Sequence, residues 1–125
     1  MITRAPRYDP FEHAAEMEIE IVERPLRTAN GLWVPEHRVV FLQRGLHRIH
    51  KRSTLAHELV HAEYGDVGRS EKQERRADRV ASRRLICGID LEMVVDTSDD
   101  PGVWAMELNV TDHLMNVFLH ERRIA

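Results

Sequence analysis

The chain lacks the features that would tie it to a membrane or an oxidising compartment. Its 125 residues include one cysteine, Cys87, so no disulfide can form within it. No apolar run approaches the roughly 20 residues needed to cross a bilayer, and no basic-then-apolar signal segment opens the sequence. These absences predict a protein of the reducing cytoplasm without a membrane anchor.

An excess of one charge is also lacking. The formal net charge is −3, which gives no general attraction to nucleic acid. There is no internal repeat or low-complexity tract, and 42% of the residues are hydrophobic, enough for the core of one domain at this length. We therefore expect residues 1–125 to form a single domain, with a flexible segment at 1–10 and C-terminal helices at 90–125.

The first third of the chain carries the two-residue period of β-strands. Polar and apolar side chains alternate over residues 18–23, and short apolar runs follow at 32–34 and 38–42. Asn30-Gly31 is a dipeptide typical of hairpin turns. The pattern predicts a small three-stranded antiparallel sheet.

The remaining segments have helical signals. A long helix is predicted to begin between Leu46 and Thr54 and to end at Tyr64, because Gly65 is a natural stop. A second long helix is predicted from the capping box Ser70-x-x-Gln73 to about Cys87. Shorter helices are predicted at 11–17, at 90–95 with Asp90 as cap, from Asp100-Pro101, and from the cap Thr111 to Arg123. The fold class is therefore α+β, with the sheet packed against a helical bundle.

The most informative residues are His57-Glu58-Leu59-Val60-His61, which match the His-Glu-x-x-His pattern of zinc hydrolases. Residues four apart share one helix face, so the imidazoles of His57 and His61 can bind one ion. Glu58, about 100° from His57, can serve as base for zinc-bound water. The alternative is an ordinary amphipathic helix with these side chains in solvent, since a chain with 8 histidines can match the pattern by chance.

Catalytic zinc sites usually have three protein ligands, so a third donor is needed. A metzincin would have glycine at position 64 and histidine at position 67, where this chain has Tyr64 and Val67. A glutamate from a later helix is another known ligand, and Glu74 has the required place. Asp78, one turn further on, can accept the second N–H of a ligand histidine. The donors that remain open are Glu63, Asp66, Glu71 and the other histidines.

The segment Thr54-Leu55-Ala56-His57-Glu58-Leu59-Val60-His61-Ala62, with Glu74-x-x-Ala77-Asp78-x-x-Ala81-Ser82-x-x-Leu85, resembles the ImmA/IrrE family of small metallopeptidases. The resemblance covers roughly residues 8–88. It implies Zn²⁺ held by His57, His61 and Glu74, with Glu58 as base. Members of this family typically cleave regulatory DNA-binding proteins, such as repressors of phages or mobile elements. Asp78 stands where the family often has Asn.

We therefore expect a zinc-dependent endopeptidase that hydrolyses a peptide bond in a specific repressor-like protein, with water activated by Glu58. The alternative is a zinc-stabilised protein that regulates a partner protein or DNA without hydrolysis. The sequence does not select the group that stabilises the oxyanion, for which the candidates are Tyr64, His37, His50 and His113.

Two further segments bear on DNA binding. Basic residues crowd the second long helix, and we interpret them as a solvated face. Residues 104–111 and the helix after them look like the turn and second helix of a helix-turn-helix. Because Leu114, Val117 and Phe118 would face inward, we expect this segment to cover the core or to recognise the substrate.

Overall fold

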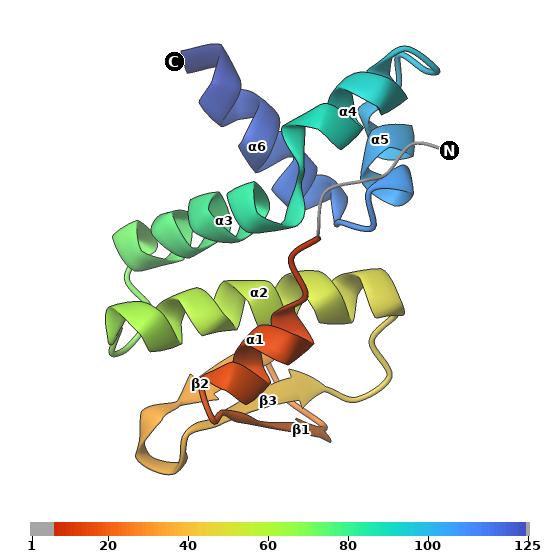
Figure 1. Cartoon of the computed structure of the whole chain (residues 1–125). Helices are drawn as coiled ribbons and strands as arrows, with labels where there is room; N and C mark the ends of the chain where they lie inside the picture. The colour runs from red at the N-terminus through yellow and green to blue at the C-terminus, as the bar shows by residue number, and fades with distance from the viewer. Residues whose placement is uncertain (1–6, 125) are drawn as a thin grey trace.

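One long helix, α2 (Arg48–Tyr64), runs through the middle of the structure (Figure 1). On one side of it lie α1 (Pro10–Glu16) and the sheet, and on the other side lie α3 (Glu71–Leu85) and the C-terminal helices. Those helices are α4 (Gly88–Val95), α5 (Pro101–Glu107) and α6 (Asp112–Ile124). The computed structural model describes residues 7–124, so residues 1–6 of the predicted flexible segment lie outside the described residues.

The sheet is mixed, with strand order β1-β3-β2. Central β3 (Val39–Gln43) runs parallel to β1 (Glu20–Arg24) and antiparallel to β2 (Gly31–Val34). The predicted α+β class and three strands are therefore confirmed, whereas the antiparallel arrangement was wrong.

A pair of hydrogen bonds between Leu26 and Gln43 supports the observed order of the strands. The Gln43 side chain accepts a hydrogen bond from Leu26 N–H at 2.7 Å and donates to the Leu26 carbonyl at 2.8 Å, which holds the segment after β1 beside the end of β3. Asn30-Gly31 therefore leads into β2 instead of turning a hairpin. The chain reverses later, in the short 3-10 turn Pro35–His37, after which Arg38 is left-handed with φ 49°.

Helix α2 is buried on two sides by separate hydrophobic clusters. Leu55 and Leu59 pack with Val40 and Leu42 of the sheet, whereas Ala56 and Val60 pack with α3 and the C-terminal helices. The side chains of Glu58 and His61, which are buried, thus lie between two apolar layers. No helix within residues 7–124 is long and apolar enough to cross a bilayer.

Most helix ends are where the sequence predicts them. The predicted signals are confirmed at Gly65, which is left-handed, at the Ser70–Gln73 capping box, and at the side-chain caps Asp100 and Thr111. Two details were wrong. Helix α3 ends at Leu85 because Ile86 is extended, and α4 begins at Gly88, so Asp90 lies inside its first turn instead of capping it.

Gly31 allows β2 to approach α2. A Cβ at this position would lie 2.6 Å from Thr54 Cγ2 and 2.9 Å from Glu58 Cγ, closer than real contacts. We expect Gly31→Ala to lower the free energy of unfolding by about 1–3 kcal/mol through overpacking, measured by denaturant titration. Gly88→Ala is the control, since its Cβ would meet only Arg122 Nη1 at 3.9 Å. Equal stability of the two variants would contradict the close contact.

Candidate metal centre

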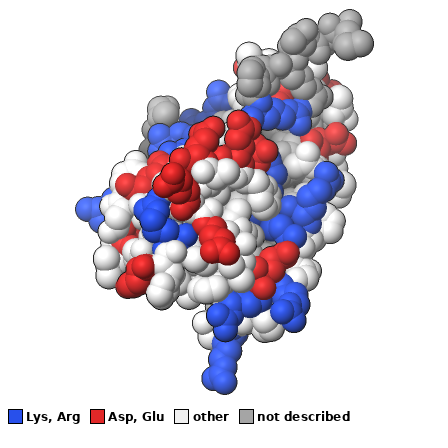
Figure 2. Space-filling view, turned by 60° about the horizontal axis from the view of Figure 1, so that its bottom comes forward, with Lys and Arg blue, Asp and Glu red and all other residues white. Residues whose placement is uncertain are grey.

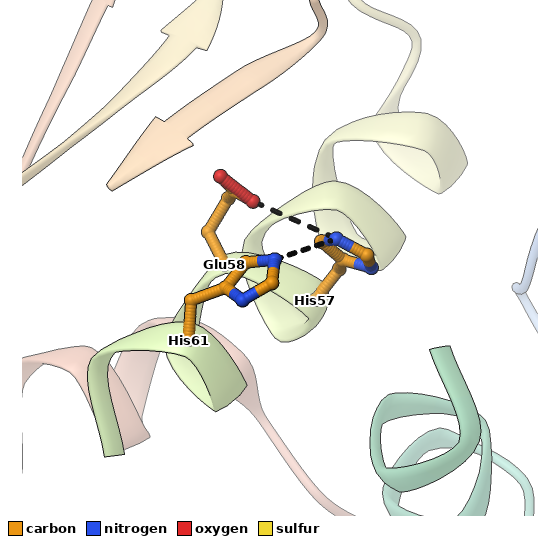
Figure 3. A group of neighbouring side chains, drawn as sticks. All are labelled: His57, Glu58 and His61. Carbon is orange, nitrogen blue, oxygen red and sulfur yellow. Dashed lines mark hydrogen bonds and ion pairs between the residues drawn. The ribbon is translucent and has the colours of Figure 1, made fainter. Parts of the chain in front are cut away.

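Three polar side chains of α2 converge on one point. Figure 3 shows His57, Glu58 and His61 projecting from the helix towards one another, and ligand atoms of all three lie within 4.8 Å of each other. The Nε2 atoms of His57 and His61 are 3.1 Å apart, and Glu58 Oε2 lies 3.8 Å from His57 Nε2. The predicted i, i+4 arrangement is thus realised, with Glu58 beside it.

Helix α3 brings Glu74 to the same point. Its Oε2 lies 2.7 Å from His57 Nε2, and its Oε1 lies 3.4 Å from His61 Nε2. The competing donor Glu71 is 92% exposed and faces Arg75, 3.8 Å away. Glu63 is bound by Arg84 and His13, so its carboxylate is engaged elsewhere. Of the predicted ligands, the structure therefore brings together His57, His61 and Glu74.

A carboxylate lies behind each histidine. His57 donates from Nδ1 to Asp78 Oδ1 at 2.8 Å, as predicted from spacing. His61 donates from Nδ1 to Asp66 Oδ2, also at 2.8 Å, and Arg76 binds the other oxygen of Asp66. Sequence reasoning treated Asp66 only as an alternative ligand. Its contact depends on the left-handed turn at Gly65, which no helical spacing encodes.

These contacts fix which ring nitrogens carry protons. Burial raises the pKa of Asp66, but the hydrogen bonds from His61 and Arg76 lower it, and the net direction is downward. Burial also raises the pKa of Asp78, but the hydrogen bonds from His57 and His113 lower it, and the net direction is again downward. Both carboxylates are therefore ionised and accept only, so the Nδ1 atoms of His57 and His61 carry protons.

A cation fits between the remaining acceptors. In the singly protonated rings both Nε2 atoms carry lone pairs, and they face each other at 3.1 Å. Glu74 adds two more acceptors, and its buried Oε1 has no hydrogen-bond partner within residues 7–124. A tetrahedral metal with bonds of about 2.0–2.1 Å places its ligand atoms about 3.3 Å apart, close to the separations here. This donor set matches the chemistry of a divalent metal site.

The charges around His57 also agree with a metal site. Burial lowers the pKa of His57, but the hydrogen bond to Asp78 and the charges of Glu58, Asp78 and Glu74 raise it, and the net direction is upward. The cluster thus attracts a positive charge. A proton can supply that charge, and a metal ion supplies it to all the acceptors at once.

Glu58 occupies a different environment from the other site residues. Its side chain is 3% exposed, and this burial raises the pKa of its carboxyl against the opposing charges of His57, His61 and Arg69. Arg69 Nη2 lies 3.7 Å from Glu58 Oε1 and donates to the Gly31 carbonyl at 2.7 Å. The carboxylate is thereby held between the sheet and the histidines.

A cleft of about 860 Å³ opens over these residues. Residues 28–31 form part of one wall, the N-terminal part of α2 with His57 and Glu58 lies along the cleft, and residues of α5 and α6 line another wall. Of the four candidates for oxyanion stabilisation, His50 and His113 line the cleft. Tyr64 and His37 are not among its lining residues.

The assignment of the third ligand can be tested on α3. We expect Glu74→Ala to lower the affinity for Zn²⁺ by at least about tenfold, because it removes one of three ligands. Glu71→Ala is the matched control on the same helix and is expected to bind like the parent protein. Competition with a chromogenic chelator measures both affinities. Stronger loss in Glu71→Ala than in Glu74→Ala would overturn the assignment.

Asp66 should influence the metal through His61. We expect Asp66→Asn to weaken Zn²⁺ binding by about 10- to 100-fold, because His61 loses a charged partner that fixes its tautomer. Asp96→Asn, at the exposed end of α4, is the control. The same chelator titration applies, and thermal unfolding of the metal-free proteins separates a loss of affinity from a loss of fold. An unchanged affinity would remove Asp66 from the site.

Comparison with known proteins agrees with this geometry. A family model, Peptidase_M78, described as an IrrE N-terminal-like domain, matches residues 14–119. No curated protein matches the chain. The match begins inside α1 and includes α4, α5 and much of α6, beyond the residues that carry the sequence resemblance. Since it spans most of the sequence, the chain belongs to the Peptidase_M78, or ImmA/IrrE, family of metallopeptidases.

Proposed function

We propose that this protein is a zinc-dependent endopeptidase that cleaves a specific regulatory, repressor-like protein. The observation that carries the proposal is the buried Glu58 carboxylate beside the acceptors of His57, His61 and Glu74, with His57 and Glu58 lining an open cleft. A purely structural metal site needs no carboxylate beside it and no access for a polypeptide.

The residues of the site have separate roles in the proposed hydrolysis. His57, His61 and Glu74 would hold zinc, which when bound polarises the peptide carbonyl and makes water more acidic. Glu58 removes a proton from the attacking water and delivers it to the departing amine. Burial, which raises the pKa of Glu58, makes its carboxylate a stronger base than an exposed one.

The cleft supports a polypeptide substrate. Its lining comes from separate parts of the chain: the loop before β2, the metal-site helix α2, the segment from α5 to α6, and also Arg69 and Asp78. A cleft of this kind can contact several residues of an extended chain, so the C-terminal helices are placed to contribute to target selection. A transcriptional regulator as target would place the reaction in the cytoplasm.

A second candidate function is a zinc-stabilised protein that binds a partner or DNA without hydrolysis. The face that carries the sheet does not favour DNA binding, because charges of both signs are interspersed on it (Figure 2). On α3, four arginines pair with carboxylates. These are Arg75, Arg76, Arg79 and Arg84. The basic helix is thus largely neutralised.

Glu58→Gln separates the two functions. We expect this variant to bind Zn²⁺ but to cleave about 100- to 10,000-fold more slowly, because the amide cannot act as a base. A proteome-derived peptide library, with new amino termini identified by mass spectrometry, supplies the substrate. Glu71→Gln is the control for a surface exchange. Cleavage by the zinc-loaded parent and by Glu58→Gln at equal rates would contradict the role of Glu58, and no cleavage by the parent would favour the binding function.

A further inference from the structure

The proposed hydrolysis leaves one role unfilled, the donor that stabilises the developing oxyanion. His113 lies in the first turn of α6, 35 residues along the chain from Asp78, and its side chain is 68% exposed. It lines the cleft together with His57 and Glu58. The inference drawn here rests on the proposed function and concerns this histidine.

One carboxylate connects His113 to the metal-site helix. Asp78 Oδ1 accepts from His57 Nδ1, and Asp78 Oδ2 accepts from His113 Nε2, each at 2.8 Å. Since an ionised carboxylate only accepts, the Nε2 atom of His113 must carry a proton. The imidazole of His113 is therefore fixed in orientation by the same group that orients His57.

The second nitrogen of His113 is left for another partner. Among residues 7–124, no hydrogen bond engages its Nδ1. Packing does not require this side chain either, because the buried residues of α6 are Leu114, Met115 and Phe118. His113 also borders the outer groove between α3 and α6, but of the two it is the cleft that it shares with His57 and Glu58. A cleft-lining, exposed histidine with one nitrogen anchored has its other nitrogen available to a ligand.

The other polar groups of the cleft fit this role less well. His50 precedes His57 by seven residues, about 10 Å along α2. Arg69 is committed to the Gly31 carbonyl and lies beside Glu58. Tyr64 lies outside the cleft, with the Arg76 guanidinium 4.2 Å above its ring.

We propose that His113 is a further catalytic residue, which donates a hydrogen bond from Nδ1 to the carbonyl oxygen of the scissile peptide while its Nε2 stays hydrogen-bonded to Asp78. The hydrogen bond strengthens as that oxygen gains negative charge. The proton stays on His113, and no bond to it is formed or broken. Glu58 remains the group that moves protons between water and the leaving amine.

His113→Ala and His120→Ala form a matched pair on α6. His120 lies seven residues further on, at the outer groove between α3 and α6, and does not line the cleft. We expect His113→Ala to lower kcat about 100-fold with little change in KM on a peptide cleaved by the parent protein. Zinc affinity should stay within about twofold, whereas a histidine that only supports Asp78 would weaken zinc binding about tenfold or more when removed.

A second readout needs no cleavage. Inorganic phosphate is a tetrahedral oxyanion, and its binding to the zinc-loaded proteins can be measured by calorimetry. We expect His113→Ala to bind phosphate about tenfold more weakly than the parent and His120→Ala to bind it equally. Equal phosphate affinity in parent and His113→Ala, or no measurable binding by either, overturns the proposal.

The two hypotheses fail in different ways. If Glu58→Gln abolishes cleavage while His113→Ala cleaves at the parent rate, the role of His113 is wrong and the peptidase assignment stands. If the parent cleaves nothing, the peptidase assignment fails, and the phosphate comparison still decides whether His113 faces an oxyanion site. Loss of zinc in His113→Ala would instead assign it a structural role behind His57.

Discussion

The close packing of α2 against α3 is the constraint on which the site depends. Ala56 and Val60 of one helix meet Ala77 and Ala81 of the other, and all four are fully buried. Small side chains at a helix crossing let the axes approach closely. Only at short range can the carboxylate of a glutamate on α3 reach imidazoles on α2. A larger residue in this contact would separate the proposed metal ligands without touching any of them.

The same crossing explains how such polar groups tolerate burial. Unpaired buried charges are costly, and here each histidine nitrogen faces a carboxylate or another ligand atom. Asp66 and Asp78 approach from outside the cluster, one from the turn after α2 and one from α3. The Nε2 atoms of His57 and His61 and the Glu74 carboxylate lie close to one another. This arrangement of acceptors fits a divalent cation.

The features that the sequence could predict are those encoded by residues close together in the chain. The helix signals at Gly65 and Ser70–Gln73, the i, i+4 histidines and the Glu74–Asp78 spacing are local, and each has its expected place in the structure. The strand order and the contacts of Asp66 and His113 are not local. They depend on a crossing segment held by Gln43, a left-handed turn and the docking of α6 on α3, none of which has a fixed sequence period.

The small sheet matters to the proposed mechanism because it holds Glu58, the proposed base, in place. Strand β2 begins at Gly31, in close contact with Thr54 and Glu58, so the strand forms one side of the compartment around the Glu58 carboxylate. Arg69 ties the Gly31 carbonyl to the loop after α2 and reaches the same carboxylate. The histidines are held by α3 and the turn after α2, whereas Glu58 is held by the sheet and Arg69. Because the proposed base is supported independently of the proposed ligands, it could stay in place while a substrate enters the cleft. In the proposed mechanism, β2 is therefore as much a part of the catalytic geometry as the helix that carries the motif.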